Sequence, residues 1–164
     1  MQLLVIRHGS AEEIAPGGDD ADRSLTKSGK REMKDVAEGL RTVIETLDVI
    51  GASPLLRAQQ TAKIVANAYG DLPVETVQAL TPGSDPSALV EWLRQNPSAE
   101  SVAIVGHQPD LGTNVTWLMT GGGNSRVDLS KGGAALLEFS SSASAGSGTL
   151  QWLLTRSQLR RLGK

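Results

Sequence analysis

Four side chains suited to binding and transferring a phosphoryl group lie at three separate places in the sequence. The chain has only two histidines, His8 and His107, and each follows a short apolar run beside a glycine. Arg7 directly precedes the first histidine, and Arg57 lies between the two. Guanidinium groups present forked donors that match phosphate oxygens, and an imidazole can form covalent intermediates. These residue types therefore predict a phosphate site with a histidine nucleophile.

The positive charge of the two arginines bears on the protonation of an imidazole placed between them. Nearby cations disfavour protonation, so that imidazole would be neutral and nucleophilic. The other histidine, if protonated, would donate to a phosphoryl oxygen and stabilise the transition state. Because the arginines can neutralise the phosphoryl charge, we expect neither a metal ion nor a cofactor.

The apolar runs before the histidines predict how the rings are brought together. Leu3–Ile6 and Val102–Val105 are short and rich in β-branched residues, which is typical of buried parallel strands. Open α/β folds build ligand sites at the carboxyl ends of such strands. We therefore expect both histidines at one sheet edge, with Gly9 allowing a sharp turn and close approach to a ligand.

Arg57 is predicted to lie at the start of a helix. A strand over residues 48–53 ends in Ser53, which is a natural N-cap, and Pro54 is a natural first helical residue. The helix would run to about Tyr69. An arginine in a first turn has the wrong sign for the positive end of the helix dipole. A bound anion would remove that conflict.

The rest of the chain alternates between helical and strand patterns. We expect a helix from residues 25–29, capped by Thr26 or Ser28, through Leu47. Further elements follow: a strand at 74–77, helices from 84 or 85 to 96 and from 109 to 119, and strands at 133–139 and 149–154. This order predicts one α/β domain over residues 1–164, a three-layer α/β/α sandwich with a mainly parallel sheet and an antiparallel edge hairpin. The basic tail, with Arg156, Arg160, Arg161 and Lys164, is predicted to be solvated.

Residues 10–24 show no periodicity and are expected to form a surface loop. Its acids are predicted to face solvent, with one of them able to approach the site. They are Glu12, Glu13, Asp19, Asp20 and Asp22. Around residues 77–86 the only acid that could donate a proton is Asp85.

Composition excludes several classes of function. The 164 residues carry a formal net charge of −2, which gives no electrostatic case for binding nucleic acid. The absence of cysteine excludes disulfides, thiolate catalysis and cysteine-ligated zinc. No apolar stretch approaches the ~20 residues that cross a membrane, and the first residues enter a strand without a signal peptide. We expect a cytoplasmic monomer.

Three motifs resemble the histidine phosphatase superfamily, whose fold is phosphoglycerate-mutase-like. They are Arg7-His8-Gly9, the segment from Ser53 to Ala62, and Gly106-His107-Gln108-Pro109, in this order. The short chain, Leu25-Thr26 with Gly29, and Leu80-Thr81-Pro82 are similar to bacterial SixA-type phosphohistidine phosphatases. The resemblance implies that His8 accepts the phosphoryl group and that Arg7, Arg57 and His107 complete the phosphate pocket. Ser10 lies where many relatives have an acid, and it and Gln108 are expected to support the site.

The resemblance and the scarcity of acids together favour cleavage of a phosphorus–nitrogen bond. An imidazole leaves far more easily than an alkoxide, so phosphohistidine can be cleaved without a strong acid. We therefore hypothesise a phosphohistidine phosphatase that acts on a phosphorylated protein, such as a histidine-containing phosphotransfer domain. One alternative is a broad-specificity small-molecule phosphomonoesterase, with Asp85 or an acid of the 12–22 loop as proton donor. The other is a non-catalytic module that binds phosphoproteins.

Overall fold

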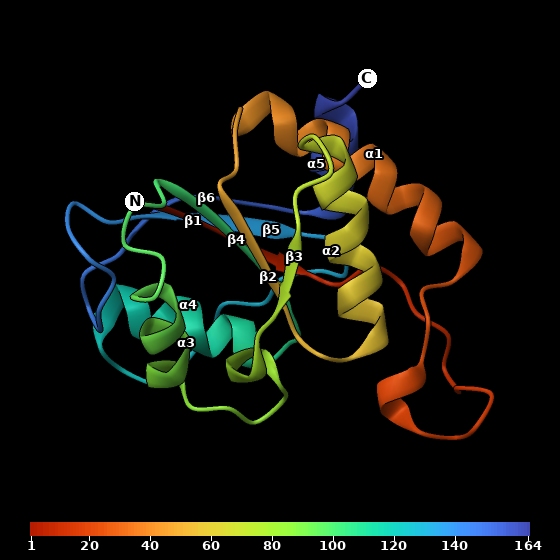
Figure 1. Ribbon diagram of the computed structural model, residues 1–164, viewed down its shortest axis with the longest axis horizontal. Helices are drawn as coiled ribbons and strands as arrows, with labels where there is room; N and C mark the ends of the chain where they lie inside the picture. The colour runs from red at the N-terminus through yellow and green to blue at the C-terminus, as the bar shows by residue number, and fades with distance from the viewer.

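The computed structural model describes residues 1–164 and contains one six-stranded sheet with helices on both faces (Figure 1). The strands are β1 (Gln2–Arg7), β2 (Val49–Ala52), β3 (Val74–Thr76), β4 (Ser101–Gly106), β5 (Ala134–Glu138) and β6 (Thr149–Leu154). The helices are α1 (Lys27–Val43), α2 (Leu56–Ala68), α3 (Pro86–Leu93), α4 (Asp110–Thr120) and α5 (Arg156–Leu162), with short 3₁₀ turns η1 (Asp20–Asp22) and η2 (Gln78–Leu80). None of these helices has both the length and the apolar character needed to cross a lipid bilayer.

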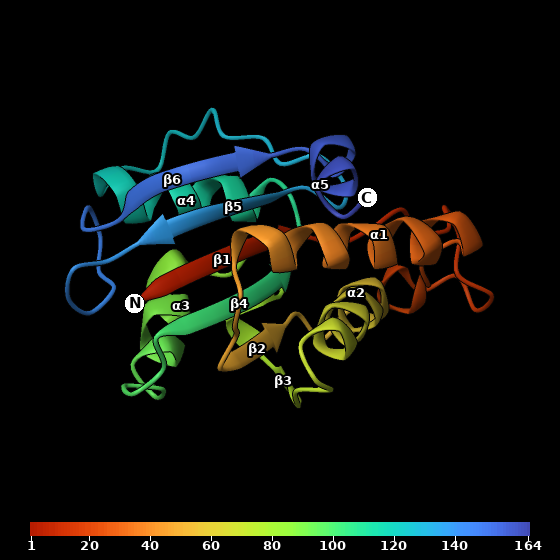
Figure 2. The same ribbon diagram turned by 90° about the horizontal axis from the view of Figure 1, so that it is seen from above.

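The strand order is β3-β2-β4-β1-β5-β6, as Figure 2 shows from above. The first four of these strands are parallel to one another, whereas β5 runs antiparallel to β1 and β6 antiparallel to β5. The predicted sandwich with an antiparallel edge hairpin is therefore confirmed.

Both faces of the central strands are buried, which explains their continuous apolar sequences. In β1, Leu4 and Ile6 belong to the core beneath α1, α2 and α5, while Leu3 and Val5 belong to the core beneath α3 and α4. This division follows the two-residue period of a strand. A sheet covered on both sides leaves only its edges and strand ends for a functional site.

The register of the parallel strands brings three polar residues to the same edge of the sheet. Arg7 of β1 pairs with Gly106 of β4, and Ala52 of β2 pairs with Val105 of β4. The residues that follow these pairs, His8, Ser53 and His107, therefore leave the sheet side by side. The predicted meeting of the two histidines follows directly from this register.

Three predicted helix boundaries are wrong, and one of them is the end of α3, which lies at Leu93 rather than at residue 96. The first helix ends at Val43 rather than Leu47, because Ile44 is already extended as the chain turns toward β2. Ile44 and Leu47 are buried all the same, so their apolar character reflects core packing from a connecting segment. The second helix begins at Leu56, with Leu55 as its N-cap and no side-chain cap, so Ser53 is not the cap.

The prediction of a solvated basic tail is right for Arg161 and Lys164, which are exposed, and wrong for Arg156 and Arg160. Residues 156–162 form α5, which begins with a capping box between Thr155 and Gln158. Leu159 of this helix is fully buried against α1. Arg156 and Arg160 pair with acids of α1, at 2.7 Å to Glu32 and 2.9 Å to Asp35 respectively. One buried leucine per two turns was too weak a pattern to indicate a packed helix.

Candidate active site

His8 lies at the end of β1 with only 7% of its surface exposed. Its Nδ1 is 2.7 Å from the carbonyl oxygen of Gly9. A carbonyl can only accept, so Nδ1 carries the hydrogen and Nε2 keeps its lone pair. Burial, together with the positive charges of Arg57 and Arg7, lowers the pKa of His8 to about 4 against the opposing effect of the Gly9 carbonyl. At neutral pH the ring is thus uncharged with a nucleophilic Nε2.

His107 lies beside His8, with the two ring centroids 5.2 Å apart. Its Nε2 is 2.7 Å from the hydroxyl oxygen of Ser53, and its buried Nδ1 has no partner in the protein. Burial, together with His8 and the positive charge of Arg57, lowers the pKa of His107 to about 3. In the free protein this ring is therefore neutral at pH 7 rather than protonated. A neutral imidazole still has one N–H to donate.

The two arginines approach the histidines from different elements. Arg7 donates from Nη1 to the carbonyl of Leu129, at 2.7 Å, in the segment that leads into β5. Arg57, in the first turn of α2, is 5% exposed and donates from Nη1 to the backbone carbonyl of Asp20 and from Nη2 to its carboxylate. The Nε atoms of both arginines are buried without a partner.

Three buried side-chain nitrogens have no hydrogen-bond partner in this protein, and all three belong to this site. They are Arg7 Nε, Arg57 Nε and His107 Nδ1. Buried polar groups are nearly always hydrogen-bonded, so a cluster of unpaired donors demands an explanation. An anion with several acceptor oxygens would satisfy all three at once.

Thr61 connects the backbone of Gly9, next to His8, to the backbone of Arg57. Its hydroxyl oxygen accepts from the Gly9 amide at 3.1 Å, and its hydroxyl donates to the Arg57 carbonyl at 2.8 Å. The side chain is fully buried. This bridge fixes the position of the Gly9 carbonyl, which in turn orients the His8 ring.

The structure places the other predicted residues outside this cluster. The Ser10 hydroxyl accepts from Arg156 at 3.1 Å, and Gln108 contacts the backbone of Gly112 and Val127. Asp85 caps α3, and hydrogen bonds from Ser87 hold the pKa of its carboxyl below the ordinary value. A carboxyl engaged in this way is a poor proton donor.

The structure gives a packing reason for the glycine at position 9. Its backbone does not adopt a left-handed conformation, but a Cβ at this position would collide with the side chain of Met33. The glycine therefore allows α1 to pack closely against the turn after His8.

Sequence reasoning missed two contacts and left a third undecided. Ser53 was interpreted as a helix cap but instead bonds to His107, and Thr61 was noted only within a motif. Thr61 follows Arg57 by four residues, and this spacing on a helix places both on one face. Asp20 was one of five loop acids, and nothing in the sequence distinguished it from the other four.

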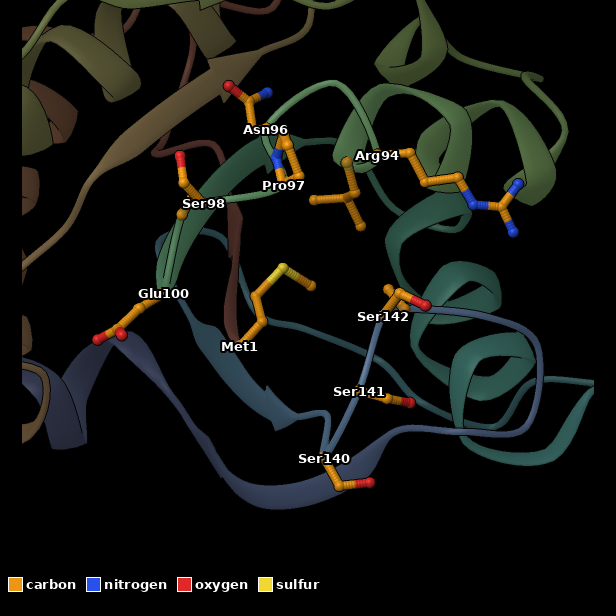
Figure 3. A pocket seen from close by; sticks show the side chains of 12 residues that line it. Met1, Arg94, Asn96, Pro97, Ser98, Glu100, Ser140, Ser141 and Ser142 are labelled. Atoms are coloured by element: carbon orange, nitrogen blue, oxygen red, sulfur yellow. The ribbon is translucent and has the colours of Figure 1, made fainter.

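Two hollows lie next to segments that carry site residues, although none of Arg7, His8, Arg57 and His107 lines them. One, of about 810 Å³, is lined by Gln108, Pro109 and residues 123–128, and the other, of about 440 Å³, by residues that include Ser10, Lys131 and Arg156. A further hollow of about 550 Å³, lined by Met1, residues 96–100 and Ser140–Ser142 among others, is shown in Figure 3. The full length of β1 separates Met1 from His8, so this last hollow is not part of the site.

Comparison with known proteins agrees with this geometry. The sequence model of the histidine phosphatase superfamily (branch 1) matches residues 3–81. A phosphohistidine phosphatase SixA homolog of Haemophilus influenzae is 32% identical over 129 residues, which are 72% of this chain and 77% of that protein. The chain belongs to the histidine phosphatase superfamily.

Other members of the superfamily match almost the whole chain. The phosphohistidine phosphatase SixA of Escherichia coli is 29% identical over 164 residues, covering 98% of this chain and 97% of that protein. The solved structure of the protein histidine phosphatase SixA complexed with tungstate superimposes with a TM-score of 0.84 at 29% identity. It covers 97% of this chain and 99% of its own. The SixA branch therefore shares its complete fold with this protein.

Proposed function

We propose that this protein is a phosphohistidine phosphatase, a hydrolase that removes phosphoryl groups from phosphohistidine on a protein. The observation that carries the proposal is the set of unpaired buried donors, Arg7 Nε, Arg57 Nε and His107 Nδ1, gathered around a neutral histidine. Such an array is complementary to a phosphoryl group that is being attacked. The similarity to the SixA proteins supports a phosphohistidine substrate.

In the first step, Nε2 of His8 attacks the phosphorus atom of the substrate. A bond forms between Nε2 and phosphorus while the bond from phosphorus to the substrate imidazole breaks. The electron pair leaves with that imidazole, which departs as a neutral ring because its other nitrogen carries a proton. The Gly9 carbonyl stabilises the positive charge that develops on the His8 ring, because it accepts from Nδ1. Arg7, Arg57 and His107 donate to the phosphoryl oxygens.

In the second step, water attacks phospho-His8 and releases inorganic phosphate. The bond between Nε2 and phosphorus breaks, and the neutral ring is regenerated with its hydrogen on Nδ1. Imidazole is the leaving group in both steps, so neither requires the strong acid that an alkoxide would need. The absence of any carboxyl bonded directly to either histidine is compatible with this chemistry.

The partner in this proposal is a phosphorylated protein, and a histidine-containing phosphotransfer domain is the specific candidate. The hollows lined by Gln108 and by Ser10 lie next to the segments that carry His107 and His8, where a partner protein could dock. A role in signal transduction, a cytoplasmic location and a monomeric state belong to the same proposal. Cell fractionation and gel filtration would test the last two.

The direct test is to trap the phosphorylated enzyme. Wild-type protein is mixed with a ³²P-labelled phosphotransfer domain and quenched in alkali, where phosphohistidine survives, and the label is located by peptide mapping. We expect it on the peptide that contains His8, and we expect His8→Ala to show neither label nor turnover. A His8→Ala protein that still turns over would refute the scheme. A strong preference for alkyl phosphates over phosphohistidine would instead favour a phosphomonoesterase, and binding of phosphate without hydrolysis would favour a binding module.

A further inference from the structure

Asp20 bonds directly to an arginine of the site although it belongs to the surface loop between β1 and α1. Two of its oxygens accept from Arg57, the backbone carbonyl at 2.9 Å from Nη1 and the carboxylate at 3.1 Å from Nη2. The Arg57 side chain is 6% exposed and that of Asp20 is 65% exposed. The contact therefore joins the rim of the site to its buried interior.

The geometry of a guanidinium group shows what this contact leaves free. The group has five N–H donors in a planar fork, and the two Nη atoms form its end. Asp20 occupies one donor on each Nη atom of Arg57. The side of the fork, made by Nε–H and the neighbouring Nη–H, keeps its donors, and Nε is buried without a partner. That side can hold two phosphoryl oxygens at once.

We propose that Asp20 is a positioning residue for phosphoryl transfer, which holds the end of the Arg57 guanidinium so that its Nε side meets the phosphoryl group on His8. This inference rests on the proposed function and adds a role for the loop. It assigns no contact between Asp20 and the substrate.

Hydrogen bonds within the loop hold Asp20 in place. Asp19 accepts from the amide of Ala21 and so caps the turn η1 that contains Asp20. Arg23 donates from Nε to Oδ1 of Asp20 at 2.8 Å and from Nη1 to the carbonyl of Glu12 at 3.0 Å. One carboxylate oxygen of Asp20 is thus bound to Arg23 and the other to Arg57.

The same contacts argue against Asp20 as the proton donor of the reaction. Burial raises its pKa, but hydrogen bonds and charge attraction from Arg57 and Arg23 outweigh that effect and hold the pKa below the ordinary value. A carboxylate shared by two arginines is ionised at neutral pH and has no proton to give. Its negative charge also cannot attract the phosphoryl group, which leaves the orientation of Arg57 as the means by which it can act.

Three variants separate these roles. Asp20→Ala removes the carboxylate, and Asp20→Asn keeps an oxygen that can accept from Arg57. Asp22→Ala is the matched control, because it removes the same charge from the same turn, and its exposed side chain makes no hydrogen bond in the structure. Circular dichroism of each variant verifies the fold, and kcat and KM are measured with p-nitrophenyl phosphate, phosphoramidate and a phosphohistidine protein.

If Asp20 positions Arg57, Asp20→Ala lowers kcat about tenfold, by a similar factor for every substrate. Asp20→Asn stays within about threefold of wild type, as does Asp22→Ala. Tungstate inhibition should weaken in Asp20→Ala but not in Asp20→Asn, because only the alanine variant loses the side-chain contact to Nη2 of Arg57.

The proposal is overturned if Asp20→Ala keeps full activity, or if Asp20→Asn loses as much as Asp20→Ala. A loss in both variants that grows with the basicity of the leaving group would identify a general acid instead. Wild-type protein and His8→Ala are assayed in the same series. Inactive wild-type protein would contradict the proposed function, whereas active wild-type protein with an unaffected Asp20→Ala variant would contradict only the role of Asp20.

Discussion

The surroundings of His8 strongly alter the protonation of its ring. Burial, together with the charges of Arg57 and Arg7, lowers the pKa of the ring from 6.5 to about 4. That difference corresponds to about 3 kcal/mol between the two protonation states. At pH 5 the ring would be about 10% protonated, compared with about 97% for an unperturbed histidine. We therefore expect the nucleophile to stay active well below the pH at which an ordinary histidine becomes charged.

NMR titration is well suited to this measurement because the chain has only two histidines. The His8→Ala variant leaves the His107 ring alone and so assigns both sets of signals. Replacing Arg57 by glutamine removes a positive charge near His8, and the pKa of the ring should rise. Arg94→Gln is the control, since Arg94 lines the hollow at the opposite end of the sheet and should leave the titration unchanged.

The same shift predicts how stability depends on pH. The folded ring has a lower pKa than the unfolded one, so between pH 6.5 and about 4 the unfolded chain binds more protons. The stabilisation is therefore fully present above pH 6.5 and is lost as the pH falls toward 4. From His8 alone, urea denaturation should give a free energy of unfolding about 2 kcal/mol lower at pH 5 than at pH 7. A His8 ring that titrates near 6.5, and does not respond to Arg57→Gln, would refute this reasoning.

Three substitutions test the supporting contacts. Ser53→Ala removes the hydroxyl that bonds to Nε2 of His107 and orients the ring, and steady-state assays should show kcat reduced about tenfold. Thr61→Val removes both hydrogen bonds of its hydroxyl at nearly constant volume, and should lower both kcat and the free energy of unfolding, the latter by about 1–3 kcal/mol. Gly39→Ala should destabilise the fold in thermal melts, although alanine is the better helix former, because its Cβ would collide with the backbone of Leu159 where α1 meets α5.

Matched variants accompany the tests at Thr61 and Gly39, and each of the three tests has a result that would contradict it. Thr61→Ser keeps the hydroxyl and should retain most of the activity, so equal losses in the serine and valine variants would contradict the bridging role. A Cβ at position 122 would have no close neighbour apart from the Thr120 hydroxyl, so Gly122→Ala should leave the thermal stability nearly unchanged. A Gly39→Ala protein as stable as wild type would mean that α5 does not pack on α1 as described. Full activity in Ser53→Ala would show that the hydrogen bond with Ser53 is not needed to orient the His107 ring.

The sheet and the meeting of the histidines were predictable because they follow from short, strong patterns. The runs before His8 and His107 are apolar on both faces, and only a central parallel strand requires that. The parallel arrangement then fixes that both rings emerge at one edge. Helix α5 could not be predicted in the same way, since Leu159 is its single fully buried residue and its arginines resemble those of a solvated segment.

The contacts around the four predicted residues depend on tertiary structure, and most of them could not be predicted from the sequence. The hydrogen bond between Ser53 and His107 joins residues 54 positions apart. The pairing of Arg57 with Asp20 depends on how the loop after β1 folds back, which its aperiodic sequence does not reveal. An arginine at the positive end of the α2 dipole needs a negative partner, as predicted. The carboxylate of Asp20 supplies part of that negative charge.

The antiparallel direction of β5 has a consequence for how such proteins can diversify. Because β5 begins where β1 ends, the connection from Gly121 to Gly133 arrives beside the nucleophile and ends with contacts to Arg7 and His8. Residues could be inserted into the middle of this connection without disturbing any strand pairing, since surface connections tolerate changes in length. Evolution could thereby reshape access to the phosphoryl group, and exchange one class of substrate for another, while the catalytic side chains stay in place.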